Sequence, residues 1–139
     1  EFGKPIYDIN KNMRTWNSGY SKTIKQFQKS GKHVIFLGDV PSLSMPPASC
    51  LETHKTNVNL CNSSFNIENY STRLKMEESV SRENSVPYIN MSSLLCSEEK
   101  CPIVVKNIVV YRDQWHVTRT FAEYASQALF ELISPHLSK

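Results

Sequence analysis

The chain lacks any long apolar run. A membrane-spanning helix is recognised from about 18 or more consecutive apolar residues, so we expect no such span here. The N-terminus lacks both the charged start and the apolar centre of a signal peptide, and it carries no initiator methionine. We therefore expect a fragment of a longer protein, and the missing targeting signal leaves its compartment open.

The basic residues do not gather into a patch. The chain has 16 Lys and Arg against 13 Asp and Glu, for a net charge of +3, and its basic residues are scattered. Nucleic-acid binding needs a basic patch or stripe, so we expect an ordinary solvated surface and no nucleic-acid partner. Hydrophobic residues make up 40% of the chain, which is enough for a packed core and argues against disorder of the whole chain.

The four cysteines lack the Cys-x-x-Cys spacing of most zinc sites. Cys50, Cys61, Cys96 and Cys101 allow three pairings. We expect Cys50 to pair with Cys61 and Cys96 with Cys101, because each pair would close a short polar loop. The alternatives are reduced thiols or a metal site completed by His54. Disulfides would place the domain outside the cytoplasm.

Hydrophobic periodicity predicts a helix followed by a buried strand. After an irregular start, apolar residues recur at helical spacing over residues 14–30. Gly31 is a suitable helix-ending residue, and we assign Trp16 and Tyr20 of this stripe to the core. Residues 33–37 form a short apolar run with β-branched members. Such a run is typical of a parallel strand that helices cover on both faces.

The middle of the chain predicts a long loop, a second helix and a second strand. The loop covers residues 41–65 and is rich in Pro and Ser. A loop of this length is usually functional or stapled, and the first cysteine pair would supply the staple. A weaker helical stripe covers residues 67–83. Residues 86–91 are predicted to form a strand, with Pro87 confined to its first positions.

The last third of the chain has the clearest pattern. Two apolar runs, residues 103–105 and 108–111, are separated by Lys106-Asn107, where we expect a turn. A final helix follows, with capping-box spacing at Thr120 and Glu123 and a proline at its end. Its apolar stripe consists of Phe121, Tyr124, Ala125, Ala128, Leu129, Leu132 and Ile133.

The alternation of helices and strands predicts an α/β fold. We expect a three-layer α/β/α sandwich with a mostly parallel sheet. In such sheets, sites gather at the carboxyl ends of the strands. Asp39 follows the first predicted strand, so it is a candidate for lining that crevice, although a role in capping the loop is at least as compatible with its position.

Asp113 and His116 lie between the last apolar run and the last helix. Three residues apart on one loop, both side chains can point into the same crevice. The Asp carboxylate can then accept a hydrogen bond from one imidazole nitrogen, which leaves the other free to take a proton from a serine hydroxyl. This spacing alone is a weak signal, because a motif needs a structural setting.

The residues around Asp113 and His116 resemble a known family, and this resemblance strengthens the interpretation of the pair as catalytic. Residues 96–121 combine two cysteines, a proline, an apolar run ending in Tyr-Arg-Asp, two further residues, and then His, Val and Thr. Upstream, residues 34–41 end in Gly-Asp-x-Pro, and the following loop carries Cys50-Leu51 and later Cys61. Together these features resemble the SGNH domain fused to membrane acyltransferases of the acyltransferase-3 family. The resemblance covers residues 16–132.

The resemblance implies an SGNH-like, flavodoxin-like sandwich, of which residues 1–139 form the C-terminal portion of one domain that is incomplete on its N-terminal side. It implies O-acyl transfer, with acetyl as the expected group, to hydroxyls of cell-envelope glycans. The implied partners are an acyl donor, a glycan acceptor and a membrane domain of the parent chain that tethers the domain outside the cytoplasm. No metal or other cofactor is implied. Within the family's Ser-His-Asp triad, Asp113 would orient His116, and His116 would act as the general base.

The sequence departs from the family pattern at the nucleophile. The family's serine lies in an early Gly-Asp-Ser block, whereas residues 38–40 read Gly-Asp-Val, and the blocks supplying the oxyanion hole are also missing. Ser42 and Ser44 are nearby hydroxyls that we assign to the turn. We favour removal of the upstream part over loss of catalysis. The competing functions are a non-catalytic extracytoplasmic binding domain and a fragment of a secreted carbohydrate esterase.

Overall fold

The computed structural model describes residues 9–64, 67–97 and 100–137. Most of the expected irregular start, residues 1–8, and the expected end of the long loop at residue 65 lie outside this part of the chain. None of the described helices is both long enough and apolar enough to cross a membrane.

The first helix, α1 (Ile9–Lys29), begins earlier than the predicted residue 14. Residues 9–13 are therefore helical rather than irregular, and Thr15 Oγ1 donates a hydrogen bond to the carbonyl of Lys11, 3.0 Å away. The helix ends as Gly31 predicts. Gly31 has a φ of 72°, and the amide of Lys32 reaches back 3.1 Å to the carbonyl of Phe27, which is the pattern of a glycine-terminated Schellman motif.

The two predicted strands form a parallel pair. Strand β1 (Phe36–Leu37) pairs with β3 (Tyr88–Ile89), with Phe36 opposite Tyr88. Helix α3 (Ile67–Glu83) connects them and keeps its predicted bounds. The expectation that β1 is buried on both faces is wrong, because Leu37 is 45% exposed. Within the described residues β1 pairs only with β3, so its other edge has no strand partner there.

A first core cluster fixes α1 and α3 on one side of this strand pair. Ile24, Val80 and Val86 are buried at its centre, and Tyr20 and Phe36 pack against them. Gly38 directly follows β1 and is buried against the ring of Tyr88, and a Cβ added at this position would overlap the Tyr88 hydroxyl. The strand end therefore requires glycine because the chain approaches Tyr88 too closely for any side chain.

The predicted loop of residues 41–65 is structured. It contains α2 (Pro47–Thr53), the 3₁₀ helix η1 (Val58–Cys61) and the short strand β2 (Ser63–Ser64). The predicted staple is present, since Cys50 and Cys61 form a disulfide. The sequence predicts a loop here because the segment is rich in Pro and Ser. Its short elements are stabilised by apolar contacts with distant residues, which local composition does not reveal.

The second predicted disulfide, between Cys96 and Cys101, is also present. It follows the unpredicted short helix α4 (Ser92–Leu95). Cys101 lies on strand β4 (Lys100–Cys101). This strand pairs antiparallel with β2, with Cys101 opposite Ser63. The two cysteine loops are therefore joined by backbone hydrogen bonds, and no cysteine of the chain remains free.

A predicted hairpin completes the C-terminal half. Strands β5 (Val104–Val105) and β6 (Ile108–Val109) pair antiparallel, and Lys106 and Asn107 between them have φ values of 48° and 64°. Positive φ at both central residues is the type I′ geometry of two-residue hairpins. The second core cluster lies behind this hairpin and consists of Leu43, Cys50, Cys61, Leu95, Cys101, Ile103, Val110, Tyr111, Phe121 and Ala125.

The last helix, α5 (Arg119–Ile133), is capped by a residue other than the predicted one. Thr118, not Thr120, is the N-cap, and its hydroxyl accepts a hydrogen bond from the amide of Phe121 at 3.1 Å. Glu123 instead pairs with Arg119 one turn earlier, at 2.7 Å. The 3₁₀ helix η2 (Ser134–His136) follows.

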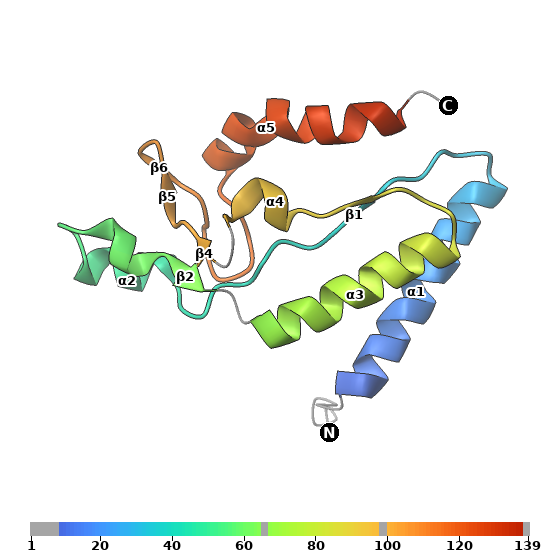
Figure 1. The fold of residues 1–139 in the computed structure, drawn as a ribbon, viewed down its shortest axis with the longest axis horizontal. Helices are drawn as coiled ribbons and strands as arrows, with labels where there is room; N and C mark the ends of the chain where they lie inside the picture. The colour runs from blue at the N-terminus through green and yellow to red at the C-terminus, as the bar shows by residue number, and fades with distance from the viewer. Residues whose placement is uncertain (1–8, 65–66, 98–99, 138–139) are drawn as a thin grey trace, which may run out of the picture.

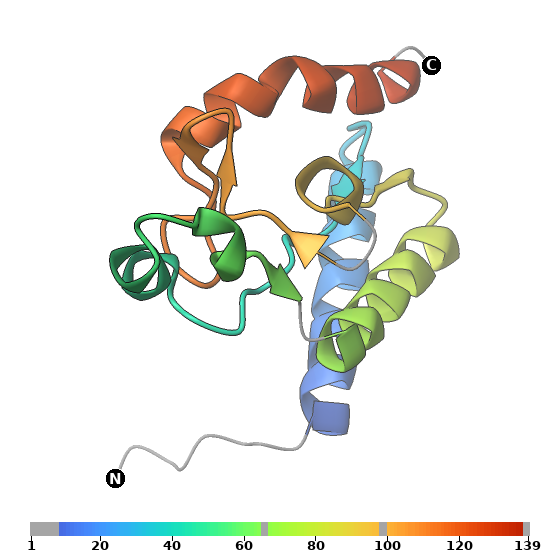
Figure 2. The ribbon, with the colours of Figure 1, turned by 60° about the vertical axis from the view of Figure 1, so that its left-hand side comes forward.

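Figures 1 and 2 show how these elements are layered: α1 and α3 lie side by side on one side of β1, and α5 lies on the other. The fold is α/β, as predicted. The described residues form three two-stranded sheets, of which one is parallel and two are antiparallel. A three-layer sandwich with a mostly parallel sheet is therefore not confirmed.

Replacing Gly38 should destabilise the fold. We expect Gly38→Ala to lower the free energy of unfolding by about 1–3 kcal/mol, the usual cost of forcing an extra group into a packed site. Gly19 is the matched control, because it lies in α1 with open space around its Cβ position. Gly19→Ala should raise stability by roughly 0.5–1 kcal/mol. Urea unfolding of both variants makes the comparison, and equal effects would contradict the close approach of Tyr88.

Removing each disulfide should destabilise the chain according to the loop that it closes. The bridges span 11 and 5 residues, so chain entropy predicts losses of about 3 kcal/mol for the Cys50–Cys61 pair and about 2 kcal/mol for the Cys96–Cys101 pair. Double Cys→Ala variants in urea unfolding would measure both. Mass spectrometry of a non-reduced digest should find these two links, and a cross-link between the two pairs would refute the assignment.

Candidate active site

A closed loop between β6 and α5 carries the predicted Asp and His. Tyr111 and Val117 form an antiparallel bridge across the base of this histidine loop, residues 111–117. Two backbone hydrogen bonds of 2.8 Å close it: the Arg112 amide donates to the His116 carbonyl, and the Thr118 amide donates to the Val110 carbonyl. Tyr111 is fully buried, so the loop is anchored in the second core cluster while its tip faces solvent.

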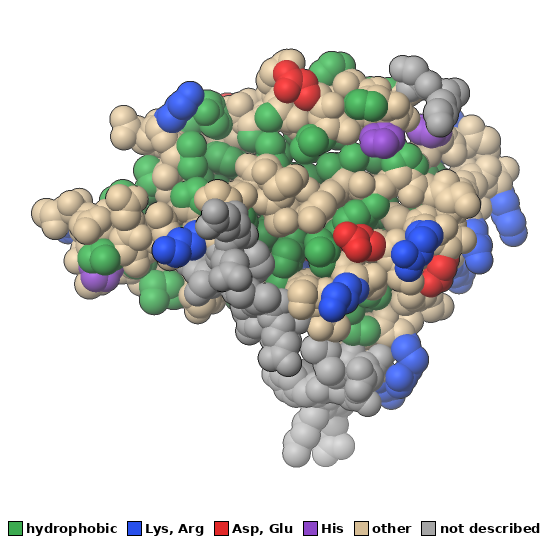
Figure 3. Space-filling model, viewed as in Figure 1, with side chains coloured by type: hydrophobic (Ala, Val, Ile, Leu, Met, Phe, Trp, Pro, Cys, Tyr) green, Lys and Arg blue, Asp and Glu red, His purple; other side chains and the backbone are tan. Residues whose placement is uncertain are grey.

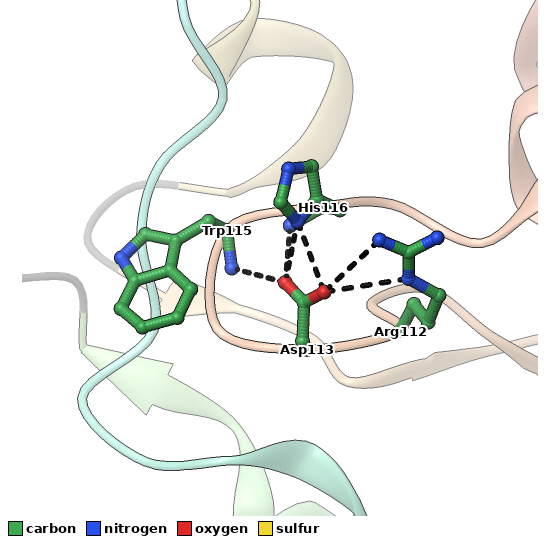
Figure 4. A network of polar contacts seen from close by, with 4 residues as sticks. All are labelled: Arg112, Asp113, Trp115 and His116. Atoms are coloured by element: carbon green, nitrogen blue, oxygen red, sulfur yellow. Dashed lines mark hydrogen bonds and ion pairs between the residues drawn. The ribbon is translucent and has the colours of Figure 1, made fainter.

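The Asp113 carboxylate organises the tip of this loop. Its Oδ1 accepts the backbone amides of Trp115 and His116, each at 2.9 Å. The same carboxylate meets His116 Nδ1 at 2.8 Å through Oδ1 and 2.9 Å through Oδ2. Arg112 donates weakly to Oδ2 at 3.3 Å. Figure 4 shows these contacts converging on one carboxylate.

These contacts stabilise the ionised form of Asp113. The amide of Trp115 contributes most, and the His116 ring and amide add to it, so the pKa of Asp113 falls to about 2. An ionised Asp113 makes His116 Nδ1 the protonated, donating nitrogen. The lone pair of His116 then resides on Nε2, which points away from the carboxylate in Figure 4 and is available as a base.

Gln114 ties the loop to the segment that follows β1. The amide of Leu43 donates to the Gln114 carbonyl at 2.9 Å, and the Gln114 side chain donates back to the Leu43 carbonyl at 3.3 Å. Gln114 is one of the two residues between Asp113 and His116, and nothing in the sequence distinguishes it. Its contact brings the histidine loop against the carboxyl end of β1, where a crevice was expected.

A cleft of about 320 Å³ opens at this junction. Trp115 lines it from the histidine loop and Trp16 from α1. The assignment of Trp16 to the core is wrong, since it is 54% exposed, whereas Tyr20 is half-buried between Trp16 and Phe36. A tryptophan on an apolar helical stripe has the same pattern whether it packs in a core or lines a cleft. Sequence reasoning therefore missed this wall.

Asp39 lies on the wall of the same cleft. It forms an ion pair with Arg73 of α3, and its carboxylate also accepts the amide of Val40 at 2.9 Å. Behind it, the buried Glu77 carboxylate accepts the amide of Asp39 at 3.2 Å and the Tyr88 hydroxyl at 2.9 Å. Burial raises the pKa of Glu77, although the Tyr88 hydrogen bond opposes this shift.

The candidate serines divide between the cleft and solvent. Ser42 lines the cleft, and Ser44 is exposed. Within residues 9–64, 67–97 and 100–137, the hydrogen bonds of His116 go to Asp113 and Arg112, and no hydroxyl reaches its ring. His33 lies elsewhere, with its Nε2 at 2.7 Å from the carbonyl of His136.

The described residues contain no group of three or more His, Cys, Asp or Glu side chains that would hold a metal ion. Both disulfides also consume the thiols that a metal site completed by His54 would need. The cysteines therefore serve as cross-links.

The sequence matches the family described as "SGNH domain (fused to AT3 domains)" over residues 3–130. The chain belongs to this family. The resemblance drawn from the Asp-x-x-His loop, the Gly-Asp-x-Pro strand end and the cysteines is thereby confirmed.

A solved structure with a similar fold is the periplasmic domain of the lipopolysaccharide acetyltransferase of Salmonella ser. Paratyphi A. The two superpose with a TM-score of 0.68 at 19% identity, over 91% of this chain and 51% of that one. The chain thus spans about half the length of that domain. No protein of curated function matches the sequence.

The titration of Asp113 tests the loop geometry in solution. Its folded pKa of about 2 lies below the unfolded value of about 3.9. Its contribution to stability is therefore present above about pH 4 and disappears as the pH falls through about 2. Carbon-detected NMR of the carboxyl group should give a midpoint near pH 2. A midpoint near 4 would mean that the hydrogen bonds to Trp115 and His116 do not form.

Proposed function

We propose that the chain is the C-terminal part of an extracytoplasmic O-acyltransferase domain. Its parent would transfer an acyl group, most simply acetyl, to a hydroxyl of a cell-envelope glycan. The observation that carries the proposal is the Asp113–His116 pair, whose Nδ1 contact of 2.8 Å leaves Nε2 pointing away from the carboxylate. The loop that holds this pair also contributes Trp115 to the cleft. Membership of a family fused to AT3 domains supports the acyltransferase association.

In the proposed reaction, His116 Nε2 removes the proton of a serine hydroxyl as the serine oxygen attacks the acyl carbonyl. The donor's leaving group departs with that proton, and an acyl-serine forms. The acceptor hydroxyl then attacks the acyl-serine, gives its proton to Nε2, and the serine is released protonated. Asp113, already ionised, holds the ring and stabilises the imidazolium in both halves.

The proposed nucleophile belongs to a part of the parent domain outside this sequence. Supporting this, no hydroxyl of the described residues reaches His116, and the similar solved domain is about twice as long. The same part would extend the β1–β3 pair into the mostly parallel sheet of a three-layer sandwich. Figure 3 shows hydrophobic side chains gathered below α5, and Leu37, Phe130 and Leu132 are exposed, as expected of faces that another segment covers.

The proposed location is outside the cytoplasm, with the parent's membrane domain as tether. Two disulfides in a small domain favour an oxidising compartment, and both are present here. A non-catalytic binding domain of the same fold is the competing function, because His116 lacks a hydroxyl partner among the described residues. The experiment below separates the two.

Replacing His116 should remove catalysis in the longer parent protein. We expect His116→Ala to lower acetyl-ester turnover by roughly 10²–10⁴-fold, the usual contribution of a general base. Asp113→Ala should also lower it strongly, because it releases the ring. The measurement is hydrolysis of a chromogenic acetyl ester, with folding verified by circular dichroism.

His54→Ala is the control, since His54 lies at the end of α2 and should leave turnover unchanged. The 139-residue chain alone should be nearly inert, because it supplies neither the nucleophile nor its oxyanion hole. Full activity of the parent after His116→Ala would favour the binding-domain alternative. Turnover by the short chain at the parent's rate would make Ser42 the first candidate nucleophile.

A further inference from the structure

The cleft beside the histidine loop has two aromatic walls from distant parts of the chain. Trp16 projects from α1 and Trp115 from the histidine loop, and both line it. Trp16 is 54% and Trp115 60% exposed, which is a high exposure for the largest apolar side chains. Both tryptophans line one concave site, and exposed apolar side chains gathered in a concavity mark a ligand-binding groove.

The Trp16 wall is held in place from behind. Its ring lies 5.6 Å from that of Tyr20, and Tyr20 meets Phe36 of β1 edge-on at 5.0 Å. This chain of ring contacts fixes one aromatic face before any ligand arrives. The backbone of Trp115 is fixed by the Asp113 carboxylate, which accepts its amide at 2.9 Å. The Trp16 ring and the Trp115 backbone are therefore held in place before a ligand arrives, which lowers the entropic cost of binding.

Polar groups line the same cleft as the two tryptophans. Asp39 and Arg73 form an ion pair there, and their side chains remain 48% and 46% exposed. The pair offers both acceptors and donors to a ligand, yet it carries no net charge. Asn12, Ser42 and Thr72 add neutral polar groups to the lining. A ligand that fits has apolar faces, hydroxyls around its edge and no charge of its own.

We propose that this cleft binds a neutral pyranose ring of the glycan acceptor, stacked against Trp16 and Trp115, with its hydroxyls on Asp39 and Arg73. A pyranose presents C–H groups on its faces and hydroxyls at its rim, which matches the arrangement of apolar walls and paired donors and acceptors. The cleft volume of about 320 Å³ lies at the lower end of small-ligand sites and suits one or two such rings.

The position of Trp115 gives the cleft a role in the reaction. Its side chain lines the cleft, and His116 is the next residue along the chain, with its ring turned to a different side in Figure 4. A sugar stacked on Trp115 would therefore be held by the loop that also carries the proposed general base. The choice of the acceptor as ligand rests on the proposed function, whereas binding by the cleft can be tested without catalysis.

Intrinsic fluorescence reports directly on this site, because both tryptophans of the chain line the cleft. The 139-residue chain would be titrated with neutral methyl pyranosides of glucose, galactose, mannose and rhamnose. We expect a saturable change for at least one of them, with a Kd of about 1 mM, as for a small and weakly held ligand. The absence of a saturable change across the panel would overturn the proposal.

Substitutions then assign the binding to the walls. Trp16→Ala and Trp115→Ala, followed by saturation-transfer NMR, should each weaken binding roughly two- to tenfold, as expected for the loss of one aromatic contact. Phe27→Ala is the matched control, because Phe27 lies on the same helix, is 52% exposed and is absent from the cleft lining. It should leave binding unchanged. Equal effects of all three variants would also overturn the proposal.

Charged probes test the neutrality of the ligand. Galacturonate and adenosine monophosphate should bind more weakly than the best neutral pyranoside, and a tighter, Trp16-dependent complex with either would refute a neutral sugar. His116→Ala should keep pyranoside binding. If the parent retained ester turnover after His116→Ala while the Trp variants lost sugar binding, the proposed catalysis would fail and the cleft assignment would stand.

Discussion

The hydrogen bonds accepted by the Asp113 carboxylate determine the shape of the candidate site. One side chain satisfies two backbone amides and an imidazole nitrogen within 2.9 Å, so it sets the turn of the loop and the orientation of the ring together. Because the carboxylate is ionised over the ordinary pH range, the protonated nitrogen of His116 is also determined. The position of Trp115 follows from the same interaction, since its amide is the largest contributor to the stability of the anion.

Local patterns predicted those elements whose cause is local. The hairpin turn at Lys106-Asn107, the end of α1 at Gly31 and the bounds of α3 depend on residue type and periodicity, and the structure confirms them. The two disulfides followed from cysteine spacing. The capping residue of α5 was misplaced because Thr118 and Thr120 are both good caps, and only the contact of Thr118 with the preceding β6 selects between them.

The walls of the cleft could not be predicted, because each of them depends on a long-range contact. Gln114 meets Leu43, 71 residues away, through two hydrogen bonds. Arg73 of α3 forms an ion pair with Asp39, which follows β1 and lies 34 residues earlier in the chain. Trp16 has the helical spacing of a core residue. It is exposed because α3 and the end of β1 do not cover the part of α1 on which it lies. Periodicity identifies the apolar face of a helix but not the part of that face that stays open.

The two core clusters are packed separately, and this has a mechanical consequence for the cleft. One cluster joins α1 and α3 to the strand pair, and the other joins the cysteine loops, the hairpin and α5. Trp16 lies on α1, which the first cluster holds, and Trp115 lies on the loop that Tyr111 anchors in the second cluster, so the cleft is a seam lined from both sides. Residues 38–43 are one of the segments that join the two clusters, and both Gly38 and Pro41 are buried in it. A sugar ring that contacts both tryptophans would therefore touch parts of the chain held by both clusters, so its binding would also stabilise the packing of one cluster against the other.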